Sequence, residues 1–504
     1  MSSRPDQAPE LLIQIDGLSR PALEGALGRG RIPVLQRLIE HDRFELRSIY
    51  AGLPSTTPAA QAELFYGVRC AVPAFAFLDR EARTPRHMLA PGAASAVERR
   101  LRAEDGGPLL RAGAAYCDIY TGGARVCRFC PSSLADPATV FSGGLAPALR
   151  TIGAYFGISG RASIMMAGEA FRFISSPRDR DGRSLRAALK DSWSRVLASI
   201  VLRDSSRLNA IRDMRDGLPI VHVNFVGYDK QAHRYGPRSQ PALRALQGAD
   251  RAIGTMIQAA RDLAGAPPTI VIYSDHGQER TSSFRQAAGR GLGALVRDSA
   301  RQVDLGAGSS PDQDRAVSRH TLGQEAGEQL LGIGAEVEQV GGQQIVAIES
   351  GPIAHIYLTG PATDEARCDL AARVASTAGQ IAVLARRSEG PPVCFLGEDR
   401  YKDAAELCSA RLVEHPFAAG VPDDLETLAA HHSAGDLILL ATGFGAALSF
   451  ASERGSHGGC GPEETHAFAL APRGLLPDPA AEAPLRLGDL RSALLHHRKD
   501  RSGP

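Results

Sequence analysis

Short apolar runs that can be buried on both faces limit the folds open to this chain more than any other feature. Their positions are residues 11–15 (LLIQI), 162–166 (ASIMM), 220–226 (IVHVNFV), 269–274 (TIVIYS), 355–358 (HIYL), 436–441 (DLILLA) and 467–471 (AFALA). Helical patterns lie between them, as in residues 243–265 (LRALQGADRAIGTMIQAARDLAG). This alternation predicts an α/β protein whose mostly parallel central sheet is flanked by helices.

The length of 504 residues allows one enlarged core with insertions, or two domains. We expect the core in residues 8–78, 217–280 and 436–475. Two less regular stretches are interpreted as insertions: 79–216, which is partly helical and contributes to core and cap, and 281–435, a cap with further core strands. The last residues, 476–504, are expected to form a C-terminal tail.

The charge balance is nearly neutral, with 57 Lys and Arg against 56 Asp and Glu. No global excess attracts nucleic-acid polymers or anionic membranes, so a small anionic substrate would be held by local charge. The longest uncharged run, residues 437–452, falls short of the roughly 20 apolar residues of a membrane helix, and no membrane segment is expected. Nothing in the sequence indicates an oligomeric state.

Eight cysteines are spread over the chain, and the polar N-terminus does not have the pattern of a secretory signal. This combination favours reduced thiols and a cytoplasmic location. Cys127 and Cys130 form a CRFC pair, with Cys117 nearby. Zinc at this pair would need further ligands, and no second CxxC follows at zinc-finger spacing. We therefore interpret the pair as ordinary buried thiols rather than as a metal or redox site.

Acidic and imidazole side chains gather where the predicted strands end. They are Asp16, after 11–15; Asp229 and His233, after 220–226; Asp275 and His276, after 269–274; and His457, before 467–471. A single Asp at a strand end is usually a turn former or a helix cap, but the recurrence weakens that interpretation. Sites of parallel sheets lie beyond the carboxyl ends of the strands, so these groups are candidates for one site.

The local spacing of these groups suits metal binding. Asp229 and His233 are four residues apart, so both lie on one face of a helical turn and can reach one ion. Asp275 and His276 directly follow an apolar strand, and Gly277 can accept a positive φ that lets the loop approach an ion. Three Asp and three His together suit Zn²⁺, with Mn²⁺ or Fe as alternatives.

Residues 53–67 (LPSTTPAAQAELFYG) offer a nucleophile. Their structural interpretation is a helix start, with Thr57 as N-cap and Pro58 at the first helical position. Their functional interpretation uses the same geometry, since a phosphate or sulfate would bind at the unpaired N–H groups of the helix N-terminus. Thr57 can then attack it if a metal lowers the pKa of the hydroxyl, and neighbouring Thr56 is the alternative.

The order IQID, STTPAAQAELFYG, YDKQAH, SDHG and GSHGG resembles the alkaline phosphatase superfamily, and within it most closely the type I phosphodiesterase and nucleotide pyrophosphatase branch. The resemblance implies an alkaline phosphatase-like core with inserted cap regions. It implies that Thr57, ten residues before Gly67, is the nucleophile. It also implies two divalent metal ions, with zinc favoured over manganese or iron. One would be held by Asp229, His233 and His457, and the other by Asp16, Asp275 and His276 in contact with Thr57.

The same resemblance implies a metal-dependent hydrolase of phosphate esters, of the phosphodiesterase or nucleotide pyrophosphatase kind, that acts on a small phosphorylated substrate. Thr57 would take the phosphoryl group, and water would then hydrolyse the covalent intermediate. A phosphomonoesterase or a phosphonate hydrolase of the same superfamily is an alternative. A non-catalytic metal- or phosphate-binding protein is an alternative from another class.

The sequence departs from the family in residues 71–81 (AVPAFAFLDRE), which contain no Asn where the nucleotide pyrophosphatases use one to hold the phosphate. That departure disfavours nucleotide diesters. Ala232 replaces a frequent Gly, which we expect to be harmless. Two further histidines are interpreted as structural: His466, which starts the 467–471 strand and is the alternative to His457, and His222, which lies within a buried strand.

Overall fold

Strand β1 (Glu10–Ile15) lies at the centre of a seven-stranded sheet. The structure is a computed structural model that describes residues 9–103, 107–134, 164–165, 192–263, 267–305, 333–340, 342–478 and 484–502. Across this first sheet the strands follow the order β2 (Phe44–Tyr50), β20 (His466–Pro472), β8 (Thr269–Tyr273), β1, β7 (Ile220–Phe225), β5 (Ala114–Tyr116) and β6 (Val126–Arg128).

The first sheet is mostly parallel, as predicted. Strand β1 pairs in parallel with β7 and β8, and β5 pairs in parallel with β7 and β6. Only β20 and β2, at one side, run antiparallel to their neighbours. Every residue of β1, β7 and β8 is buried, which explains why these strands are apolar on both faces.

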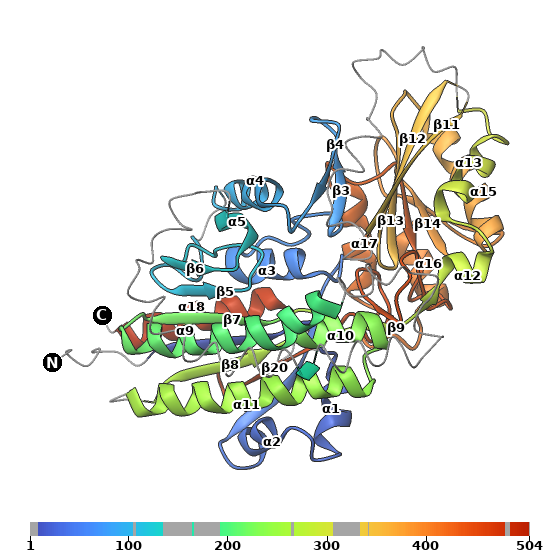
Figure 1. Ribbon diagram of the computed structural model, residues 1–504. Coiled ribbons are helices and arrows are strands. Elements are labelled where there is room, and N and C mark those ends of the chain that lie inside the picture. Colours follow the sequence, from blue (N-terminus) through green and yellow to red (C-terminus); the bar gives the residue numbers. More distant parts are fainter. Residues whose placement is uncertain are drawn as a thin grey trace.

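Helices cover both faces of the first sheet (Figure 1). On one face, alternate residues of β1 such as Leu11 and Ile13 pack with α1 (Arg20–Leu27), α2 (Pro33–Glu40), α9 (Arg203–Arg215) and α11 (Gln240–Leu263). On the other face, Leu12 belongs to the cluster formed with α3 (Thr57–Tyr66), α4 (Pro91–Leu101) and α18 (Leu487–Ser502). Residues expected to form a C-terminal tail are therefore in part a helix, and Arg486 just before it pairs with Glu63 of α3.

A second seven-stranded sheet is entirely antiparallel. Its order is β11 (Ile333–Val340), β12 (Gln343–Ser350), β13 (Ile353–Leu358), β17 (Leu437–Leu440), β14 (Ala382–Ala385), β15 (Val393–Leu396) and β16 (Asp399–Tyr401). Its two faces are covered by α13 (Leu292–Ala300) with α15 (Asp364–Ala378), and by α16 (Ala404–Arg411) with α17 (Val421–Ala430).

Two of the predicted strands, 355–358 and 436–441, lie in this second sheet rather than in the parallel one. Only the turn residues Gly351 and Pro352 join β12 to β13, and so short a connection makes this pair antiparallel, whereas β17 enters the sheet by pairing with the distant strands β13 and β14. The predicted strand at 162–166 lies largely outside the described residues, and its two described residues, Ile164 and Met165, are helical.

Shorter elements complete the described structure. They are β3 (Ala76–Asp79), β4 (Thr84–His87), α5 (Pro131–Leu134), the π-helical stretch η2 (Leu197–Leu202), α10 (Gly227–Tyr235), β9 (Glu279–Arg280), β10 (Ser282–Ser283), α12 (Phe284–Ala288), β18 (Leu448–Ser449) and β19 (Gly455–Ser456). None of the helices in the described ranges combines the length and the apolar character needed to cross a membrane.

Candidate metal centre and active site

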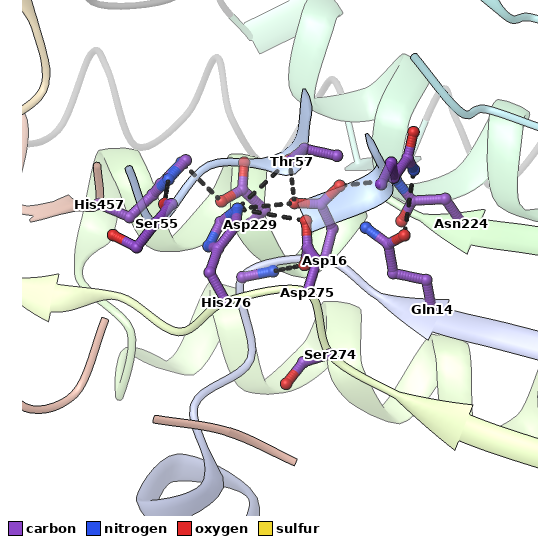
Figure 2. Close-up of polar contacts among 12 residues, drawn as sticks. Gln14, Asp16, Ser55, Thr57, Asn224, Asp229, Ser274, Asp275, His276 and His457 are labelled. Carbon is purple, nitrogen blue, oxygen red and sulfur yellow. Dashed lines mark hydrogen bonds and ion pairs between the residues drawn. The ribbon is translucent and has the colours of Figure 1, made fainter. Parts of the chain in front are cut away.

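The parallel strands bring the predicted site residues to one edge of the first sheet (Figure 2). Asp16 follows β1, Asp275 and His276 follow β8, and Asp229 lies in the first turn of α10, directly after β7. His457 reaches the same place because β19, which precedes it, pairs with β9, three residues after His276.

The ligand atoms form two overlapping groups. Those of Asp16, Asp275 and His276 lie within 4.8 Å of one another, and so do those of Asp229, His276 and His457. In the first group, His276 Nε2 is 3.3 Å from Asp275 Oδ2 and 3.8 Å from Asp16 Oδ1. His276 therefore lies between the two groups.

His233 joins the second group from the helical face that it shares with Asp229, as the spacing of four predicted. Its Nε2 is 3.3 Å from Asp229 Oδ2 and 3.2 Å from His457 Nε2. His457 Nε2 is in turn 3.6 Å from Asp229 Oδ1.

The three imidazoles are oriented alike by backbone carbonyls. Nδ1 of His233 lies 3.0 Å from Gly455 O, that of His276 2.9 Å from Gly277 O, and that of His457 2.9 Å from Ser55 O. A carbonyl oxygen only accepts, so each Nδ1 donates its proton, and Nε2 is the nitrogen that presents a lone pair whenever the ring is neutral. Second-shell carbonyls orient metal-ligating histidines in this way.

Burial sets the protonation of two of these rings. It lowers the pKa of His276 to about 4 and that of His457, with help from the charge of His276, to about 3. Both are therefore neutral at pH 7, as a metal ligand must be. Burial acts in the same direction on His233, but the charges of Asp229 and Glu453 outweigh it and raise the pKa of His233 well above its usual value.

Three carboxylates face one another in the same enclosed space. Burial, followed by the charges of Asp275 and Asp229, raises the pKa of Asp16 well above its usual value. Burial and the charge of Asp229 raise the pKa of Asp275 to about 7. For Asp229, burial is opposed by the charges of His233 and His457, which lower its pKa.

One oxygen of this cluster, Asp275 Oδ2, is buried and has no hydrogen-bond partner among the described residues. An anionic oxygen without a donor is costly, and a cation would compensate it. The donor set of carboxylates and neutral imidazoles, the facing Nε2 lone pairs and this oxygen all fit bound divalent cations.

The hydroxyl of Thr57 lies against the first ligand group. Its Oγ1 is 3.5 Å from Asp16 Oδ1 and 3.3 Å from His276 Nε2. The helix start differs by one residue from the prediction, because Thr56 is the N-cap of α3 and Thr57 is the first helical residue. The hydroxyl of Thr56 is buried without a hydrogen-bond partner in the described part of the chain.

Two glycines allow the loops to approach one another. Gly277 does not use the positive φ that a glycine can accept, since the described glycines with positive φ do not include it. Gly277 is required for another reason, because a Cβ there would collide with the carbonyl of Glu463. Gly17 does have a positive φ of 71°, and a Cβ at this position would lie 2.6 Å from Asp229 Oδ1.

Polar residues that sequence reasoning did not single out support the ligands. Asn224 Nδ2 donates to Asp16 Oδ2 at 2.7 Å, and the amide of Gln278 donates to Asp229 Oδ1. Glu464 is fully buried and accepts hydrogen bonds from Gly459 N (2.9 Å), Gly461 N (2.7 Å) and Ser55 Oγ (3.2 Å). It thereby ties the loop of His457 to the segment before Thr57. The only signal in the sequence was the polar alternation of His222 and Asn224 along an apolar strand.

Two histidines lie outside the ligand groups. His222 is fully buried and contacts Asp118 Oδ2 (2.8 Å) and the hydroxyl of Tyr273 (2.7 Å), in keeping with a structural role. His466 Nε2 contacts Ser48 Oγ at 2.9 Å, on the pairing between β20 and β2.

Comparison with known proteins relates this chain to one family. Residues 172–378 match the model of the family described as type I phosphodiesterase / nucleotide pyrophosphatase. The matched range includes Asp229, His233, Asp275 and His276, whereas Asp16, Thr57 and His457 lie outside it. No curated protein matches this chain.

Two solved structures are similar over nearly the whole chain. Phosphonoacetate hydrolase from Sinorhizobium meliloti 1021, in complex with phosphonoformate, is 17% identical, with a TM-score of 0.46 and coverage of 98% of this chain and 96% of that one. Murine ectonucleotide pyrophosphatase/phosphodiesterase 5, in complex with AMP, is 11% identical, with a TM-score of 0.46 and coverage of 97% and 94%.

The family match thus confirms that the chain resembles the type I phosphodiesterase and nucleotide pyrophosphatase branch of the alkaline phosphatase superfamily, as the motifs predicted. It also confirms the prediction of a hydrolase that acts on phosphoester or pyrophosphate bonds.

Proposed function

We propose that this protein is a metal-dependent phosphodiesterase in which Thr57 is the nucleophile. The observation that carries the proposal is the position of the Thr57 hydroxyl, at the first residue of α3 and within 3.5 Å of both Asp16 and His276. A hydroxyl at a helix N-terminus faces the place where backbone N–H groups favour a phosphoryl group.

Two divalent cations, with zinc favoured, would be held by the two ligand sets. Asp229, His233 and His457 form one set. Asp16, Asp275 and His276 form the other, which contacts Thr57. When bound, such cations lower the pKa of a hydroxyl group and neutralise charge on phosphoryl oxygens.

The proposed reaction has two displacements at phosphorus. The oxygen of Thr57 attacks phosphorus as its proton is lost to solvent, and the bond to the leaving oxygen breaks. The leaving group gains a proton from water. In the second displacement the oxygen of a water molecule attacks phosphorus, the bond to Thr57 breaks and the Thr57 hydroxyl forms again. Asn224 holds Asp16 in place through both steps, and the carbonyls at Nδ1 keep the imidazoles oriented.

The test is hydrolysis of bis-p-nitrophenyl phosphate and p-nitrophenyl phosphate by zinc-loaded protein. We expect the diester to be cleaved faster, and Thr57→Ala to reduce its turnover at least a thousandfold while metal content stays the same. Thr56→Ala is the matched control and should change turnover by less than about fivefold. Faster cleavage of the monoester would assign a phosphatase instead, and the reverse order of the two variants would move the nucleophile to Thr56.

A further inference from the structure

The CRFC motif, residues 127–130, places one large apolar side chain in an unusual backbone conformation. Phe129 follows strand β6 with a φ of 61°, in the left-handed region that bulky residues rarely adopt. The residue is 44% exposed.

The flanking cysteine holds this conformation. Cys130 is fully buried, and its Sγ lies 3.6 Å from Ala115 O, on the neighbouring strand. Its carbonyl accepts a hydrogen bond from Ser133 Oγ at 2.8 Å. The chain is therefore anchored directly after Phe129. Cys130 is buried, as the sequence interpretation expected, whereas Cys127 is only partly buried.

Phe129 lines the cavity into which the candidate active site opens. This cavity has a volume of about 290 Å³, and Thr57, Asp229 and His457 line it as well. Cys117, another non-glycine residue with positive φ (60°), also lines it. Backbone strain of this kind concentrates at functional sites, where it aims particular side chains.

Several apolar side chains line the same cavity as Phe129, and we call them its apolar wall. They are Phe75, Leu89, Ile119, Leu197 and Leu202. Leu89 is 39% exposed, so two of the large hydrophobic side chains that the described structure leaves exposed belong to this one cavity. Exposed apolar surface gathered at a cavity is typical of a binding site.

Charge at the same wall is scarce. Apart from the ligand cluster and buried Asp118, the charged residues that line the cavity in the described ranges are Lys230 and Glu453, and Glu453 contacts His233 Nδ1 at 3.1 Å. No arginine from the described residues lines it. A polyphosphate or another highly charged group would need several basic partners. An uncharged group needs none.

We propose that Phe129 is a specificity-determining residue, and that the phosphoryl group bound at Thr57 carries an uncharged aryl substituent packed against Phe129, Leu89 and Phe75. This inference rests on the proposed function, since it names the class of ester that the site would accept. The substrate class is therefore aryl phosphate esters rather than esters of charged alcohols.

The test compares binding of three phosphonates to zinc-loaded protein by isothermal titration calorimetry: phenylphosphonate, methylphosphonate and 4-carboxyphenylphosphonate. Burying a phenyl ring should make phenylphosphonate bind about tenfold to a hundredfold more tightly than methylphosphonate. The added carboxylate should remove most of this gain, because burying a charged group beside apolar side chains costs free energy.

Phe129→Gly isolates the ring, because glycine adopts a φ of 61° without strain and the fold is expected to tolerate the change. It should reduce the phenyl preference to about threefold or less and leave methylphosphonate affinity within about twofold. Ala112→Gly is the matched control. Ala112 has a φ of 62°, is exposed and lies outside the cavity lining, so its variant should keep the full preference.

The proposal is overturned if wild type shows no phenyl preference, if Phe129→Gly retains it, if the carboxylate improves binding, or if no phosphonate binds. Turnover of bis-p-nitrophenyl phosphate by the same samples separates this inference from the proposed function. Hydrolysis without a phenyl preference refutes only the specificity, whereas a phenyl preference lost in Phe129→Gly without hydrolysis refutes only the reaction.

Discussion

The carboxylate of Asp275 is the most informative group to change, because it is buried close to the carboxylates of Asp16 and Asp229. Its side chain is 0% exposed, and burial together with the charge of Asp229 raises its pKa to about 7. We predict that Asp275→Asn stabilises the protein in the absence of metal and destabilises it, relative to wild type, in the presence of metal.

The magnitude follows from the pKa. A rise from 3.8 to about 7 corresponds to roughly 4 kcal/mol of destabilisation by the ionised carboxylate at pH 8. Asparagine keeps the shape of the side chain without its charge, but burial of the amide offsets part of the gain. We therefore expect a net stabilisation of about 2 kcal/mol for Asp275→Asn. For a chain of 504 residues this is a rise of about 2 °C in Tm.

Bound metal should make wild type more stable than Asp275→Asn, the reverse of the order in EDTA. Cations at a thousandfold excess over Kd stabilise wild type by about 4 kcal/mol, and the variant gains less because it lacks one anionic ligand. Differential scanning calorimetry at pH 8, with EDTA and with excess zinc, measures the difference in Tm between the two proteins without and with metal. Asp250→Asn is the control, since Asp250 is also buried (1% exposed) but accepts from Val34 N and Leu35 N at the start of α2, and its effect should not depend on metal. Lower stability of Asp275→Asn in EDTA would refute the reasoning.

Three further predictions concern the same site. His457→Ala should weaken zinc binding at least tenfold in calorimetric titrations, whereas His466→Ala, outside the cluster, should stay within about twofold; the opposite result would make His466 the ligand. In EDTA, the contribution of Asp275 to the free energy of unfolding should fall as the pH rises from about 4 to 7, because its raised pKa lets the folded protein hold a proton that the unfolded chain has lost. Urea denaturation curves should show a smaller fall of this free energy with zinc than with EDTA. Equal falls in the two conditions would contradict the prediction. Glu464→Gln should lower the free energy of unfolding in urea by about 2–4 kcal/mol and also weaken zinc binding, because an amide NH2 would then face the backbone N–H groups of Gly459 and Gly461. An unchanged zinc affinity would exclude a link between Glu464 and His457.

Local sequence alone determined the three central strands of the first sheet and the local geometry of the ligands. Residues 11–15, 220–226 and 269–274 are apolar on both faces, and such runs are stable only between two layers of helices, which is where β1, β7 and β8 lie. Asp229 and His233 share one side of α10 because the helical period places residues four apart together. These features depend on periodicities of a few residues.

Tertiary structure decided which distant segments meet. The antiparallel second sheet follows from pairings such as β13 with β17, about eighty residues apart, which no local period encodes. The collision that requires glycine at position 277, the support of the His457 loop by Glu464 and the exposure of Phe129 in the cavity likewise depend on chain approaches across the fold. Local sequence patterns specify which side chains a segment presents. The packing of the two sheets and their helices determines which other side chains they meet.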